Sequence, residues 1–146
     1  MGIRAPQLVS AGLIHRAGHV LIGQRRNTDK HALKWEFPGG KVESGESPQE
    51  ALVRELHEEL QIDATIGAEL AHYEYKYATG SGLHLLFFEI YNFTGQPKNR
   101  VYKQICWTVL PELPSFDFLE GDLDLVRRLA RGDFKKLLEC SRSAPG

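Results

Sequence analysis

Apolar residues in this chain fall into short strand-like runs, with one longer stretch of helical spacing between them. The runs 7–14 and 20–26 are separated by a turn at 16–19, so they predict a β-hairpin. Over 69–78, tyrosines alternate with polar residues, which predicts a strand with one wetter face. The same criteria predict the remaining segments: a strand ending at Phe37, a connection over 63–68, a central strand over 83–93, a strand over 101–110, a loop over 111–118, and helices over 122–131 and 133–140.

The helical stretch 48–60 carries a clear start signal. Ser47 is a suitable N-cap, with Pro48 at the first helical position and Glu50 three residues after the cap. Leucines at every fourth position form one stripe, as expected for a side that faces the core. Just upstream, Pro38-Gly39-Gly40 is expected to end the preceding strand and turn the chain.

Three carboxylates project from a different face of this predicted helix. Glu55, Glu58 and Glu59 stand at positions i, i+3 and i+4, so they lie within about a turn of each other. A cation bound among them would relieve their repulsion at neutral pH, and oxygen ligands of this kind suit Mg²⁺ or Mn²⁺. The alternative is a solvated helix face with charge pairs, in which Arg54 and Arg26 offset part of the charge.

Length and composition fit one globular domain. The chain has 146 residues, 42% hydrophobic and 25% charged, and we expect a single domain over 1–140 followed by a polar tail over 141–146, of the kind that is often disordered. A net charge of −1 gives no electrostatic basis for binding nucleic acid polymers or membranes. There is neither a membrane-length apolar run nor a secretory signal, so a cytoplasmic location is the default expectation. The positions of Cys106 and Cys140 do not suggest a disulfide framework.

Residues 40–62 resemble the Nudix box, whose pattern is G-x5-E-x7-R-E-U-x-E-E-x-G-U with U a bulky apolar residue. Glu46 and residues 54–59 match its fixed positions. Gln61 stands where the pattern has glycine. A helix end in the left-handed conformation is cheapest for glycine, so we expect Gln61 to cost about 1 kcal/mol of local stability. The preceding segment WEFPGGK is similar to the MutT-like branch of the family.

This resemblance implies a fold and a chemistry. Nudix proteins are α/β/α sandwiches around a mixed sheet, which fits the α+β pattern of elements predicted here. The family hydrolyses nucleoside diphosphates linked to another group, and the expected cofactor is Mg²⁺, with Mn²⁺ as a substitute. By resemblance, Glu58, Glu59 and the backbone carbonyl of Gly39 bind the metal. Glu55 is the general base or a further ligand, and Arg54 orients the glutamates through charged hydrogen bonds.

The resemblance also points to substrate contacts. Arg26 and Lys41 are expected at the phosphates, although a solvated strand end is the alternative for Arg26. Asp122 matches a polar residue that hydrogen-bonds the nucleobase; it would accept from base N–H groups and, if protonated, also donate, which suits a guanine-like edge, including an oxidised one. A plain helix N-cap is the alternative for Asp122. Residues that either line a base pocket or belong to the core are Phe37, Phe116, Phe118 and Leu119. Glu46 is either structural or a more distant metal ligand.

One expected acidic residue is missing. MutT-like enzymes often place a further carboxylate late in the sheet, a few residues before a tryptophan, but the corresponding places before Trp107 hold Val101 and Lys103. We therefore expect fewer acidic ligands, with Lys103 either at a phosphate or facing solvent.

The sequence thus predicts a hydrolase that cleaves a nucleoside triphosphate, such as oxidised 8-oxo-dGTP, to the nucleoside monophosphate and pyrophosphate. Two alternatives remain. One is hydrolysis of another nucleoside diphosphate derivative, such as ADP-ribose or a dinucleoside polyphosphate. The other is a nucleotide-binding sensor with negligible turnover. The expected partner is a nucleotide, and the expected assembly is a monomer or a homodimer.

Overall fold

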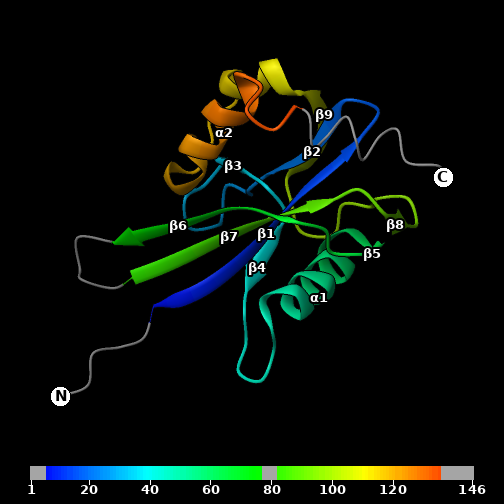
Figure 1. Cartoon of the computed structure of the whole chain (residues 1–146), viewed down its shortest axis with the longest axis vertical. Helices are drawn as coiled ribbons and strands as arrows, with labels where there is room; N and C mark the ends of the chain where they lie inside the picture. Colours follow the sequence, from blue (N-terminus) through cyan, green and yellow to red (C-terminus); the bar gives the residue numbers. More distant parts are fainter. Residues whose placement is uncertain (1–5, 77–81, 136–146) are drawn as a thin grey trace.

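The computed structural model describes residues 6–76 and 82–135, which form a mixed β-sheet between two helical layers (Figure 1). Helix α1 (Pro48–Leu60) covers one face. Helix α2 (Leu123–Ala130) covers the other face together with the short 3₁₀ helices η1 (Leu110–Ser115) and η2 (Glu120–Asp122). The predicted α/β/α sandwich is therefore confirmed.

The sheet has β1 and β7 at its centre. Strands run in the order β3-β2-β1-β7-β6, and β4 also pairs with β1 while β9 pairs with β2. The β1–β7 pair is parallel, and the predicted β1–β2 hairpin is antiparallel. The strand bounds are β1 Gln7–Arg16, β2 His19–Gln24, β3 Trp35–Glu36, β4 Gly39–Lys41, β5 Asp63–Ala64, β6 Glu69–Lys76, β7 Gly82–Ile90, β8 Phe93–Thr94 and β9 Gln104–Val109.

Helix α1 begins and ends as its local sequence predicts. The Ser47 side chain accepts from the Glu50 N–H at 3.0 Å, and the Glu50 carboxylate accepts from the Ser47 N–H at 2.8 Å, which completes a capping box. At the other end, Gln61 adopts the left-handed conformation with φ 57° and ψ 35°, and its N–H donates to the His57 carbonyl. The non-glycine residue thus stands in the conformation that glycine adopts at least cost.

Each helical layer buries a separate apolar cluster against the sheet. The α1 side contains the leucine stripe of the helix together with inward-facing strand residues: Leu52, Leu56, Leu60, Ile14, Leu21, Phe88 and Ile90. The α2 side contains Leu125, Val126, Leu129, Leu13, Phe37, Phe87 and Phe118. Burial on both faces fixes the position of α1, and with it the direction in which its carboxylates point.

Strand β3 ends before Pro38, as predicted, but the expected turn at Pro38-Gly39-Gly40 contains a further strand. Gly39–Lys41 forms strand β4, antiparallel to β1, and the Pro38 carbonyl accepts from the Gly12 N–H at 2.8 Å. Glycine is needed here because the two backbones lie very close. A side chain at Gly39 would collide with the carbonyl oxygen of Ser10.

Several predicted boundaries also differ from the structure. Strand β2 ends at Gln24, so both following arginines lie beyond it, and β9 begins only at Gln104. The predicted connection over 63–68 contains β5, which pairs with β8, and the predicted loop over 111–118 contains most of η1. Of the predicted helix over 133–140, residues 136–140 lie outside the described part of the chain, as do residues 77–78 of the predicted strand over 69–78.

Within the described residues, no helix is both long and apolar enough to cross a lipid bilayer.

Candidate active site

Helix α1 lies beside the segment 35–41, and the carboxylates of the helix contact the backbone of that segment. The Gly39 N–H donates to Glu59 Oε1 at 3.1 Å, which holds the carboxylate against strand β4. A Cβ atom at Gly40 would collide with the carboxylate of Glu55. The two glycines therefore let two of the predicted metal ligands approach the backbone directly.

Arg54 connects the box loop to the helix. Its Nε and Nη2 donate to the two oxygens of Glu46 at 2.7 and 2.9 Å, a bidentate pair. Nη1 donates to Glu55 at 2.9 Å, and Nη2 also donates to the Lys41 carbonyl at 3.1 Å. Hydrogen bonds from Arg54 lower the pKa of Glu46 to about 2, so Glu46 remains a carboxylate and serves to fix Arg54.

Glu59 lies in the most acidic and enclosed part of the site. Burial raises its pKa to about 9, and the charges of Glu36 and Glu55 act in the same direction. Burial is also the main reason that the pKa values of Glu36 and Glu55 are raised. A cluster of carboxylates with raised pKa values is a setting in which a bound cation would favour the ionised forms, so the donor chemistry fits a hard divalent metal.

These carboxylates do not converge closely enough to surround a metal ion. Across 6–76 and 82–135, no three Asp, Glu, His or Cys side chains converge on one point in a way that could hold an ion. The Glu58 side chain is 57% exposed and lies 3.5 Å from Arg54. Glu58 shares a helix face with Glu55 and Glu59 and has the freedom to rotate toward them.

The buried carboxylates make the stability of the metal-free protein depend on pH. Between the unfolded pKa of a glutamate, about 4.3, and the raised folded pKa of Glu59, about 9, the unfolded chain has released a proton that the folded protein retains. The free energy of unfolding in EDTA is therefore expected to fall as the pH rises from 5 to 9. Urea unfolding measures it. Glu59→Gln should flatten the dependence, and an equally steep fall in that variant would contradict the assignment.

Segment 35–41 also contacts Asp122, which is 6% exposed and lies just before α2. The Phe37 N–H donates a hydrogen bond to the Asp122 carboxyl. Burial, followed by the charge of Glu36, raises the pKa of Asp122 well above its usual range and favours the neutral acid. Asp122 occupies the N-cap position of α2, but its side chain makes no capping hydrogen bond. The N-cap alternative is therefore wrong.

Asp122 lines a cavity of about 510 Å³ beside the sheet. Phe118 and Leu119 also line it, but Phe37 and Phe116 do not. Phe37 is 3% exposed and packs against Phe87 and Phe118, with ring centroids 5.9 and 5.1 Å away. The ring of Phe37 thus belongs to the core, and only its backbone reaches the candidate base site.

The two predicted phosphate contacts lie at the surface. Arg26 is exposed, and its side chain forms no hydrogen bond or ion pair with any described residue. Lys41 is exposed at the end of β4, next to the Arg54 contact.

Sequence reasoning missed two residues that enter the site. Glu36 pairs with Arg25 at 2.8 Å, and the Tyr102 hydroxyl lies 3.2 Å from both Glu36 and Glu59. A sequence signal was available only for Glu36, which stands within WEFPGGK, the segment that is similar to the MutT-like branch.

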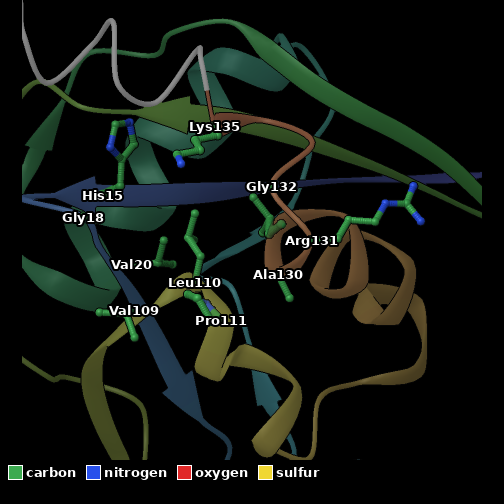
Figure 2. Close-up of a pocket in the computed structure, with 11 residues that line it drawn as sticks. His15, Gly18, Val20, Val109, Leu110, Pro111, Ala130, Arg131, Gly132 and Lys135 are labelled. Carbon is green, nitrogen blue, oxygen red and sulfur yellow. The ribbon is translucent and has the colours of Figure 1, made fainter.

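A second cavity, of about 380 Å³, has none of the site carboxylates in its lining (Figure 2). It lies between β2, η1 and the end of α2, and contains none of the predicted site residues. Its lining residues are His15, Gly18, Val20, Val109, Leu110, Pro111, Leu129, Ala130, Arg131, Gly132 and Lys135. Its lining is the more apolar of the two cavities, but the chemistry of the carboxylates lies elsewhere.

Comparisons with known proteins agree with this geometry. Residues 6–129 match the NUDIX domain. A CTP pyrophosphohydrolase from Escherichia coli K12 is 36% identical over 118 residues, which cover 81% of this chain and 87% of that protein. An 8-oxo-dGTP diphosphatase from the same strain is 32% identical over 124 residues, covering 84% and 95%. A solved MutT structure from work on Aliivibrio salmonicida and Vibrio cholerae has a TM-score of 0.76 and 31% identity, covering 87% of this chain and 98% of that one.

The chain belongs to the Nudix hydrolase family. Within that family it is a MutT-like pyrophosphohydrolase. Nudix hydrolases generally use a divalent metal.

Proposed function

We propose that this protein is a Mg²⁺-dependent pyrophosphohydrolase that cleaves a nucleoside triphosphate, with water, to the nucleoside monophosphate and pyrophosphate. The observation that carries the proposal is the carboxylate face of α1, with Glu59 held by the Gly39 N–H and Glu55 held by Arg54. This arrangement places carboxylate oxygens, the hard donors that Mg²⁺ prefers, on a rigid helix beside the main-chain polar groups of β4.

Glu58, Glu59 and the carbonyl of Gly39 would hold the metal. When bound, the cation neutralises charge on the phosphates and so lowers the barrier to attack by water. Glu59 is already positioned by its backbone hydrogen bond, whereas the exposed side chain of Glu58, one residue earlier, is free to adjust. Arg54 keeps Glu46, Glu55 and the Lys41 carbonyl in fixed relation through its four hydrogen bonds.

Glu55 is the best candidate for the general base, or else a further ligand. Its half-buried position raises its pKa, which brings it closer to the range in which a base works at neutral pH. The hydrogen bond from Arg54 fixes the direction of its carboxylate. Arg26 and Lys41, both exposed cations, would contact the phosphate chain.

The base would enter the cavity that Asp122 lines. A neutral carboxyl presents one donor and one acceptor side by side. That pattern complements the N3 and N4 groups of cytosine, and also the O6 and N7–H groups of guanine oxidised at C8. Unoxidised guanine offers two acceptors at O6 and N7 instead. CTP and 8-oxo-dGTP, named for the two Escherichia coli relatives, are therefore the first substrates to try.

A nucleotide panel tests the proposed function. We expect pyrophosphate release from one or a few nucleoside triphosphates with Mg²⁺, little of it with EDTA, and a preference for CTP or 8-oxo-dGTP over dGTP. Faster cleavage of ADP-ribose or a diadenosine polyphosphate would favour the alternative substrate class. Nucleotide binding without turnover of any compound would favour a sensor.

Asp122→Ala is expected to lower kcat/KM for the preferred nucleotide about tenfold to a hundredfold, mainly through KM. Asp122→Asn should retain most activity, because an amide also presents a donor beside an acceptor. The measurement is kcat/KM for each base, with Asp124→Ala on the same helix as the control. An unchanged ratio between bases in Asp122→Ala would show that Asp122 does not select the base.

A further inference from the structure

Tyr102 enters the acidic site from the segment in which a late carboxylate was expected. Its neighbours Val101 and Lys103 are both exposed, whereas the Tyr102 side chain is buried, with 4% of its surface accessible. The side chain that this segment delivers to the site is thus a phenol, from the position between the two where an acid was sought.

Hydrogen bonds to its backbone hold this segment in place. The Asn99 side chain donates to the Tyr102 carbonyl at 2.7 Å and accepts from the Tyr102 N–H at 2.8 Å. The Lys103 N–H donates to the Gln24 carbonyl at 2.8 Å. The segment is therefore attached to strand β2 and has little freedom to move.

The ring of Tyr102 occupies space that only a glycine leaves open. It lies over Gly23, where an added Cβ would stand 2.7 Å from a ring carbon. Residues in strands usually carry side chains, and glycine weakens a strand. The presence of Gly23, the next-to-last residue of β2, is explained by the ring that lies against it.

The hydroxyl at the end of this ring reaches two carboxylates. It lies 3.2 Å from Glu36 Oε2 and 3.2 Å from Glu59 Oε1. Glu59 Oε1 also accepts from the Gly39 N–H, so two donors converge on one oxygen of this carboxylate. The other oxygen, Oε2, is left for a cation.

We infer that Tyr102 is a positioning residue for the metal site: its hydroxyl holds Glu59 so that Oε2 faces the cation. This inference rests on the proposed function, because it assumes that Glu59 binds the metal. A phenol carries one proton, and it donates that proton to Glu59 when the cation keeps Glu59 ionised. Glu36, held by Arg25 at 2.8 Å, is the other carboxylate within 3.2 Å of the hydroxyl and competes with Glu59 for the same proton. Hydrogen-bond partners of this kind orient metal ligands and commonly affect metal affinity.

The test is Mn²⁺ binding to the protein without nucleotide, measured by the electron paramagnetic resonance signal of free Mn²⁺. Tyr102→Phe keeps the ring and removes only the hydroxyl, and we expect it to weaken Mn²⁺ binding about tenfold. Tyr73→Phe is the matched control. It removes a hydroxyl that bonds Asp124 at 2.8 Å and Arg128 at 3.0 Å, and it should bind Mn²⁺ as the unmodified protein does.

Gly23→Ala provides a second variant, since it displaces the ring while keeping the hydroxyl. Weaker Mn²⁺ binding in both Tyr102→Phe and Gly23→Ala, with folding retained by circular dichroism, would support the inference. Wild-type affinity in folded Tyr102→Phe would overturn it while leaving the proposed function in place. If the unmodified protein fails to bind Mn²⁺, the proposed function itself is contradicted, and this inference with it.

Discussion

Replacing Glu58 by glutamine is expected to lower kcat about a thousandfold without unfolding the protein. The change removes one charged ligand, and the loss of about 4 kcal/mol of transition-state stabilisation corresponds to that factor. Stability should hardly change, because the Glu58 side chain is exposed and its 3.5 Å ion pair with Arg54 contributes little.

The measurement is steady-state pyrophosphate release at saturating Mg²⁺, beside thermal unfolding of the same samples. Glu112→Gln, at an exposed glutamate in η1, is the control for the loss of a surface charge. Activity within threefold of the unmodified protein in Glu58→Gln would remove Glu58 from the ligand set.

Replacing Arg54 by lysine is expected to lower kcat/KM tenfold to a hundredfold, although the charge is retained. The guanidinium donates to both oxygens of Glu46 and also to Glu55 and the Lys41 carbonyl. A lysine ammonium cannot make all of these hydrogen bonds at once. Glu46 and Glu55 would lose their fixed orientation. Removing hydrogen-bond partners of metal ligands commonly lowers metal affinity or activity about tenfold to a hundredfold, which sets the size of the expected effect. Stability should fall by about 1 kcal/mol, since the Arg54 pairs are partly exposed.

Arg127→Lys offers a comparison at an exposed arginine on α2, whose 3.7 Å contact with Asp124 should tolerate the exchange. Kinetics and thermal unfolding of both variants would separate the two effects. A loss of stability in Arg54→Lys with unchanged kcat/KM would mean that Arg54 only fastens the loop to the helix.

Features encoded by short-range sequence were predictable. The capping box of α1 uses residues three apart, and the carboxylate face follows from helical spacing alone, so both could be found without a structure. The left-handed Gln61 followed in the same way from its place after the last helical turn.

Features that depend on distant residues could not be predicted in this way. Gly39 suggests a turn when only its neighbours are considered, and its true constraint is the backbone of Ser10. Tyr102 lies 43 residues from Glu59 in the chain, so its contact exists only through the packing of β2. The N-cap alternative for Asp122 could be tested only after the fold had buried the side chain beside Phe37.

Segment 35–41 has a consequence for how such enzymes change over evolution. The Phe37 N–H holds the Asp122 carboxyl and the Gly39 N–H holds Glu59, and the two residues are no more than about 7 Å apart along the main chain. Main-chain atoms thus set the distance between the two carboxyl groups, and a substitution at Asp122 leaves those main-chain atoms unchanged. Mutations at Asp122 can then alter base preference while the hydrolytic end keeps its place, so new specificities can arise in single steps from a working enzyme.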